Sequence, residues 1–368
     1  MSTGLQIALV AVAAGLSCAL AGVFLVLRRM AMMADAISHA ILPGLVGGYV
    51  LARGPNIFIG FIGAALAGLL TVVLVETLTK SRRVKEDAAI GIVFPFLFAI
   101  GVFVVSKYFA NVHIDTDAVL YGEIAFAPFD TFVVNGRNLG PQSLWILGGL
   151  ALVNALFLTL FYKELKLSTF DAGLAASLGL APVLLHYLLM GIVAVTTVGA
   201  FSAVGAILSV ALIIVPPVTA SLLTRKLPNL IALSMLVGVL SALVGNWLAN
   251  VWNVSISGMI ATVLGGVFGL VLLGSPTQGL ISQALRRHRQ RTQFATEMLV
   301  VHLATHEATP QQATESTLIH LEQELGWQAE RAKRVVGKAQ QQGLIHYRDG
   351  SLTLTDSGKQ LASLVAAR

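Results

Sequence analysis

The chain has 368 residues, of which 56% are hydrophobic and 11% are charged, and its mean hydropathy is +0.81. This composition excludes a soluble globular domain, in which about a quarter of the residues are charged. The single cysteine, Cys18, excludes an intrachain disulfide bond and lies in an apolar run, where a thiol is usually inert. We therefore expect a membrane protein without disulfide bonds.

Apolar segments long enough to cross a bilayer as helices recur along the first three quarters of the chain. Two of them, 182–201 and 203–223, are nearly continuous, and one of these is a candidate for a broken or re-entrant helix. The sequence therefore predicts an all-α polytopic membrane protein with eight or nine transmembrane helices. The segments lie at 5–27, 31–52, 57–79, 88–107, 142–162, 182–201, 203–223, 229–250 and 256–274.

The basic residues of the connecting loops fall mainly on one side of these predicted spans. Such an excess marks the cytoplasmic side of a membrane protein. The amino terminus is then outside, and the carboxy-terminal region is in the cytoplasm. The basic side holds Arg28, Arg29, Lys80, Arg82, Arg83, Lys85, Lys163, Lys166, Arg225, Lys226, Arg286, Arg287, Arg289 and Arg291, and the other side holds Arg53, Lys107 and Arg137.

Asp35 and His39 stand inside a segment that otherwise looks like membrane. An ionisable group at the centre of a membrane helix costs roughly 2.5–3.5 kcal/mol on insertion scales. Their i, i+4 spacing places both side chains on one helix face, where a carboxylate and an imidazole form half of a site for a divalent cation. The alternative is a structural pair, in which Asp35 accepts a hydrogen bond from His39.

The cytoplasmic stretch 168–180 between two predicted spans is rich in small residues and weakly charged. Ser168 or Thr169 is a candidate N-cap, and Gly179 is placed to end a short helix. A short helix with a smooth face fits a groove on a partner protein. The alternative is an ordinary connector at the membrane surface.

Several of these segments resemble the permease family of metal-ion ABC importers, which carry manganese, zinc or ferrous iron. The resemblance covers about residues 1–275. Its motifs are Asp35–Gly44, Glu86–Phe94, the surface helix from Phe170 to Gly179, Leu212–Ala220 and Ser257–Thr262.

The resemblance implies two permease chains (identical or paralogous), cytoplasmic ATPase subunits and an external metal-binding lipoprotein in the bacterial cytoplasmic membrane. It also implies that Asp35 and His39 line the translocation pathway at the interface between the permease chains. No Gly-x-x-x-x-Gly-Lys-Ser/Thr motif occurs in the sequence, so the chain is expected to be a transporter subunit and not the ATPase. The coupling helix that docks on the ATPase would comprise Asp171, Ala172, Gly173, Leu174, Ala175, Ala176, Ser177, Leu178 and Gly179.

One Asp and one His give only two ligands, and a two-fold symmetric dimer would bring two of each to its axis. Mixed oxygen and nitrogen ligands suit Mn(II), Fe(II) or Zn(II). Manganese is our first choice, and the metal is expected as cargo and not as a permanently bound cofactor.

Other polar residues carry weaker signals. In the external loop, His113, Asp115 and Asp117 form a possible accessory metal site or a solvated polar strand. Near the ends of two spans, His186 is expected at the membrane interface and Glu76 is expected to reach the cytoplasm.

The composition changes near residue 275, and a basic linker at 276–291 is expected to lead to a cytoplasmic domain at 292–368. Helices are predicted at 293–306, 314–325 and 327–342, and residues 344–354 alternate across an Asp349-Gly350 turn, which indicates a hairpin. Thr355 would cap a last helix. This order resembles a small α+β winged-helix domain.

Seven basic and eight acidic residues in 292–368 leave this domain near neutral, so we expect no nucleic-acid partner. A regulatory or dimerising role is favoured. His302 and His306, at i, i+4, are a possible regulatory metal site, although this pattern also fits a solvated helix face. The alternative function for the whole chain is a membrane-tethered, metal-responsive transcriptional regulator.

Overall fold

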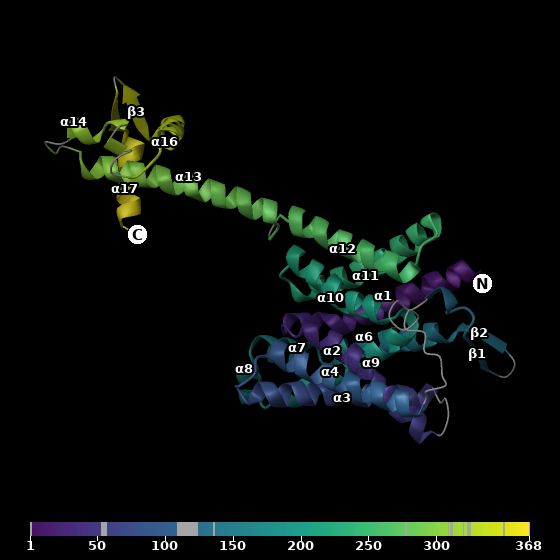
Figure 1. Ribbon diagram of the computed structural model, residues 1–368. Coiled ribbons are helices and arrows are strands. Elements are labelled where there is room, and N and C mark those ends of the chain that lie inside the picture. The colour runs from purple at the N-terminus through teal and green to yellow at the C-terminus, as the bar shows by residue number, and fades with distance from the viewer. Residues whose placement is uncertain are drawn as a thin grey trace. The chain divides into compact units, whose positions relative to one another are not determined.

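The protein is described from a computed structural model, which covers residues 2–52, 57–108, 124–134, 137–276, 278–307, 309, 312–318, 320–321, 325–348 and 350–367. The chain divides into two compact units, Met1–Gly279 and Leu280–Arg368 (Figure 1). Each unit is described by itself below.

The first unit is a bundle of long apolar helices. Among the described residues, nine helices are long and apolar enough to cross a membrane, which confirms the polytopic helical fold. They are α1 (Thr3–Leu27), α2 (Ala31–Leu51), α3 (Ile57–Lys80), α4 (Glu86–Tyr108), α6 (Gln142–Leu160), α9 (Pro182–Val204), α10 (Ala206–Leu223), α11 (Leu227–Trp252) and α12 (Ile256–Gly274).

Helix α1 is the centre of the bundle. It packs against α6, α9, α10 and α11, and its side chains from Val10 to Leu25 are almost all buried. A helix that is apolar on all sides is stable in this position because every face meets another helix.

The two nearly continuous segments after residue 181 form two separate helices. Gly205 lies between α9 and α10 with φ +83°, a conformation that favours glycine. Pro216 and Pro217, in contrast, lie inside α10 without ending it.

Short elements mark opposite ends of the bundle in Figure 1. The N-terminus lies at the same end as the antiparallel pair β1 (Thr131–Val134) and β2 (Arg137–Pro141), which follows the 3-10 turn η1 (Ile124–Phe126). Helices α7 (Tyr162–Phe170) and α8 (Ala172–Ser177) lie at the other end.

Glycine allows α2 and α3 to approach closely. A methyl group added to Gly44 would collide with the backbone at Gly63, and one added to Gly48 would lie 2.7 Å from the Ile59 carbonyl oxygen. On α4, Gly101 likewise lies against Pro43. Small residues spaced by four are typical of such contacts between membrane helices. These contacts fix α2 against α3 and α4.

A buried amide joins three helices of the bundle. The Asn154 Nδ2 group of α6 donates to the Ser17 carbonyl of α1 at 2.9 Å and to the Thr196 hydroxyl of α9 at 3.1 Å. Because a buried polar group without a partner is costly in an apolar interior, this bonding favours one arrangement of the three helices.

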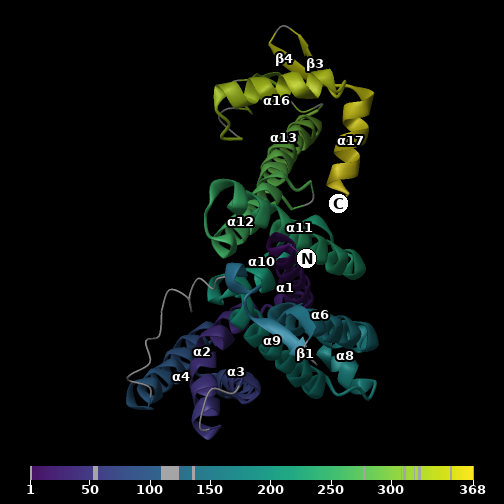
Figure 2. The same ribbon diagram turned by 90° about the vertical axis from the view of Figure 1, so that its right-hand side faces the viewer.

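The second unit is a small α+β domain. Its strands pair antiparallel, with Ile345 opposite Leu354, beside α16 (Figure 2). Its elements are α13 (Leu280–Thr305), α14 (Gln312–Glu315), α16 (Ala329–Gln341), β3 (Ile345–Arg348), β4 (Ser351–Leu354) and α17 (Asp356–Ala366).

The first helix of this unit is longer than predicted, and the predicted cap of its last helix is confirmed. The helix expected at 293–306 begins at Leu280, so residues 280–291, expected as a linker, are helical. The Thr355 hydroxyl accepts from Gly358 N at 3.1 Å and caps α17, as predicted. Part of the helix expected at 314–325, and Asp349 of the turn, lie outside the described residues.

The α2–α3 contact gives a stability test. Gly44→Ala should destabilise the purified protein by about 1–3 kcal/mol, because the added methyl overpacks the helix contact. Gly47→Ala is the matched control, since it lies in the same helix and its added methyl meets nothing within 4 Å. Thermal unfolding in detergent measures both variants. Equal unfolding midpoints would show that the contact does not hold the two helices together.

Candidate functional site

Asp35 and His39 face each other on the first turns of α2. The His39 Nε2 and Asp35 Oδ1 atoms are 3.5 Å apart. The Ser38 hydroxyl donates to the Asp35 carbonyl at 2.8 Å, within the same helix. The sequence spacing thus places a carboxylate and an imidazole at one point, as the helical pattern predicted.

This pair lies on a face of α2 that the described residues leave partly exposed. The side chains of Asp35 and His39 are 36% and 37% exposed, whereas the buried residues between Met33 and Ile41 are at most 2% exposed. In a membrane protein, a half-exposed acid must face water or another protein chain, because lipid cannot solvate it.

The position of the pair along α2 is also fixed. Asp35 is the fifth residue of the helix and His39 the ninth. At 1.5 Å per residue they lie about 6 and 12 Å from its start. The helix begins close to Arg28, on the side of the membrane that the loop charges assign to the cytoplasm.

Two motifs that are distant in sequence meet at this pair. The Phe94 ring of α4 lies 5.5 Å from the His39 ring, centroid to centroid. Pro43, one turn beyond His39, lies inside α2 and has no N–H group to donate to the His39 carbonyl. The ring contact thus orients the imidazole, and the proline removes the usual helical donor beside it.

Among the described residues, Asp35 and His39 do not belong to any group of three or more metal-ligating side chains. Two protein ligands leave most positions of a divalent ion unfilled. The pair can therefore take part in a metal site only with ligands from water or from another chain.

The exposed surface helix lies where the sequence predicted it. Helix α8 covers Ala172–Ser177, and of its residues only Ala175 is buried. Phe170, Leu174 and Leu178 are 65%, 46% and 64% exposed. Gly179, with φ +81°, follows the helix. An exposed apolar surface of this kind on a short, well-defined helix is typical of a binding surface.

The predicted N-cap of this helix is wrong. The Asp171 carboxylate, and not Ser168 or Thr169, caps α8 by accepting from Leu174 N at 2.9 Å. The Ser168 and Thr169 hydroxyls instead accept hydrogen bonds from the Arg28 guanidinium, at 3.0 and 3.1 Å. Arg28 therefore ties the end of α1 to the segment that leads into α8.

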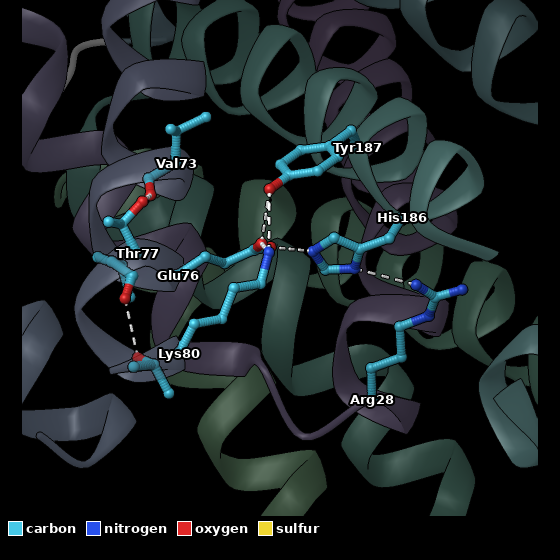
Figure 3. A network of polar contacts seen from close by, with 9 residues as sticks. Arg28, Val73, Glu76, Thr77, Lys80, His186 and Tyr187 are labelled. Atoms are coloured by element: carbon cyan, nitrogen blue, oxygen red, sulfur yellow. Dashed lines mark hydrogen bonds and ion pairs between the residues drawn. The ribbon is translucent and has the colours of Figure 1, made fainter. Parts of the chain in front are cut away.

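Arg28 also continues into a polar network with residues of α3 and α9 (Figure 3). Its Nη1 group lies 3.1 Å from His186 Nδ1 of α9. His186 Nε2 contacts the Glu76 carboxylate of α3, which also accepts from the Tyr187 hydroxyl at 2.9 Å and from Lys80 at 3.0 Å.

The donors in this network assign the His186 tautomer. A guanidinium can only donate, so Nδ1 of His186 must accept from Arg28, and Nε2 must carry the hydrogen that it donates to Glu76. Burial lowers the pKa of Arg28 from its ordinary value, although the side chain stays cationic.

The sequence interpretation missed this network. His186 was expected at the membrane interface and Glu76 was expected to reach the cytoplasm, but the two side chains contact each other between α9 and α3. The available signal was three ionisable residues at the ends of three predicted spans on the same side. Their pairing depends on which helices pack side by side. The apolar pattern of the sequence does not contain that information.

The remaining predicted ligands separate into two groups. His113, Asp115 and Asp117 lie outside the described residues. His302 and His306 lie at the end of α13 in the second unit, where Glu315 joins them.

Comparison with known proteins places this arrangement in a family. The model of the ABC 3 transport family matches residues 2–275. The chain belongs to the ABC 3 transport family. It is therefore a permease subunit of an ABC transporter, not an enzyme, and a multi-pass protein of the bacterial inner membrane, with the ATPase on a separate chain.

Relatives in this family extend the match. The permease is 44% identical to the zinc transport system membrane protein TroD of Treponema pallidum, over 97% of both chains, so that alignment includes the second unit. It is 47% identical to the manganese transport system membrane protein MntD of Bacillus subtilis, over 74% of this chain and 92% of MntD.

A solved structure, PsaBC from Streptococcus pneumoniae in complex with Fab, matches with a TM-score of 0.63 and 28% identity. The match covers 76% of this permease and 94% of the matched chain. The bundle described above thus shares its fold with this solved chain.

The network around Arg28 predicts that this side chain contributes more to stability than the side chain of Arg29. Arg28→Ala should destabilise the permease by about 2 kcal/mol, because it removes charged hydrogen bonds to Ser168, Thr169 and His186. Arg29→Ala is the matched control, since Arg29 is exposed and its loss removes the same loop charge. Thermal unfolding in detergent compares the two. A larger loss for Arg29→Ala would contradict the role of the network.

Proposed function

We propose that this permease carries a divalent metal ion inward and that Asp35 and His39 are its transit ligands. The observation that carries the proposal is the acid–imidazole pair on the open face of α2. Among the described residues, the two groups contact each other but belong to no larger cluster of ligating side chains, and both are of the types that bind first-row divalent metals.

The names of the relatives support manganese or zinc as cargo. TroD is named for zinc transport and MntD for manganese transport. One carboxylate oxygen and one imidazole nitrogen per chain suit either ion. Manganese is the first choice, and uptake measured with both ions in competition decides between them.

A second permease chain would complete the site. If the open face of α2 lies at a two-fold axis, two carboxylates and two imidazoles converge on one ion. The same packing would remove the half-exposed acids from lipid. A site of few ligands close to the cytoplasmic end of the helix also favours release, which a transporter needs as much as binding.

The two ends of the bundle suggest where partners bind. The exposed apolar surface of α8 fits a groove on an ATPase subunit, and Arg28 links the preceding segment to α1, immediately before the helix of Asp35. The opposite end, with the β1–β2 pair, would receive the external metal-binding lipoprotein. A displacement of α8 would thus be passed to the transit ligands through the hydrogen bonds of Arg28.

The transit ligands can be tested by uptake. Asp35→Asn and His39→Ala should each reduce manganese or zinc uptake by about tenfold or more, because each removes a ligand from the ion. Ser38→Ala is the matched control, since it lies between them in the chain, is buried and loses only a hydrogen bond within its helix. Radiometal uptake into proteoliposomes of the assembled transporter measures the effect. Normal uptake by an inserted, assembled Asp35→Asn variant would exclude the carboxylate from the pathway.

The docking helix can be tested at one position. Gly173→Arg should abolish metal-dependent stimulation of ATP hydrolysis and weaken co-purification with the ATPase, because a long charged side chain projects from the α8 surface. Gly173→Ala is the control, because its methyl would meet only Asp171 Oδ1, at 3.5 Å. If both variants couple normally, α8 does not dock on the ATPase.

A further inference from the structure

The end of α13 brings a second set of metal-ligating side chains together, in the unit that the family model does not cover. One ligand atom each from His302, His306 and Glu315 lies within 4.8 Å of the other two. We infer that these three residues form a binding site for a first-row divalent cation, separate from the transit pair.

The three side chains come from two elements. His302 and His306 are one helical turn apart at the end of α13, and Glu315 is the last residue of α14. The His306 Nδ1 atom contacts the Glu315 carboxylate, and the His302 and His306 rings are 4.7 Å apart, centroid to centroid. Only the histidines are close in the sequence, so the fold supplies the third ligand.

Their surroundings differ from a solvated helix face. The side chains of His306 and Glu315 are 27% and 13% exposed, and Leu303, between the two histidines, is packed in the domain core. Partial burial strengthens the attraction between a carboxylate and a cation because less water competes with it.

The distances suit a metal ion. Bonds of 2.0–2.2 Å from zinc to nitrogen and oxygen place neighbouring ligand atoms about 3.3–3.5 Å apart in a tetrahedral site. The three ligand atoms lie within 4.8 Å of one another, so only short shifts would separate them from that range. A cavity of about 80 Å³ beside His306, Glu315 and Ser316, which His302 does not line, has room for waters that would complete the coordination of the ion, each of which needs about 30 Å³.

Neighbouring residues define the extent of the site. The His320 ring lies 5.9 Å from that of His302, which makes His320 a candidate for a fourth ligand. Glu307 also lines the cavity, but it forms an ion pair with Lys359 and raises the pKa of that lysine. Two imidazoles and one carboxylate favour Zn²⁺ over Mn²⁺, which follows the general order of affinities.

The test uses Zn²⁺ and the tag-free full-length chain in detergent, with Asp35→Ala and His39→Ala present throughout to remove the transit pair. Equilibrium dialysis followed by metal analysis should find that His306→Ala or Glu315→Gln removes one equivalent of bound zinc per chain. His346→Ala is the matched control, because His346 is an exposed histidine of the same unit, on β3. It should leave the bound zinc unchanged.

A second measurement distinguishes the loss of the metal site from a loss of folding. In the protein with intact His306 and Glu315, zinc at 100 times its dissociation constant should raise the unfolding midpoint, and the isosteric Glu315→Gln variant should lose this shift while keeping its midpoint without metal. If His306→Ala and Glu315→Gln bind as much zinc as the His346→Ala control, or if zinc shifts no midpoint, the three residues form only an ion pair. Because the transit pair is absent from this background and neither measurement uses transport, neither result depends on the proposed cargo.

Discussion

An ionisable side chain inside an apolar bundle needs partners, because hydrocarbon does not solvate charge. Two carboxylates of this permease meet that requirement differently. Glu76 is surrounded within the chain by His186, Tyr187 and Lys80. Among the described residues, Asp35 pairs with His39 at 3.5 Å, and its side chain is 36% exposed. The first arrangement is complete and holds helices together. The second is incomplete, and an incomplete site is where a transported ion or a second chain can contribute.

Close helix packing decides which face of α2 stays open. Gly44 and Gly48 let α3 approach one side of the helix, and Gly101 of α4 lies against Pro43. The residues on those sides are buried, whereas Asp35 and His39 lie on a side that the described residues leave partly exposed. The same packing brings Phe94 to the imidazole. The position of the pair is therefore a consequence of backbone contacts that only glycine permits.

The polar network around Arg28, near the start of α2, links structure to the proposed coupling. Arg28 binds Ser168 and Thr169, and thereby joins the segment before α8 to the end of α1. Asp35 follows Arg28 by seven residues. A displacement of α8 by a partner would act on the start of α2 through a few strong hydrogen bonds and not through the whole bundle. Charged hydrogen bonds suit this role because their geometry is specific.

The sequence alone determined the membrane-spanning helices, the pairing of Asp35 with His39 and the surface helix at Ala172–Ser177, because apolar length and i, i+4 spacing act within one helix. Only the tertiary structure decided the rest. It showed that Arg28 binds Ser168 and Thr169, that His186 meets Glu76, and that Glu315 joins His302 and His306. These contacts join side chains on different elements, and no local periodicity records which elements are neighbours.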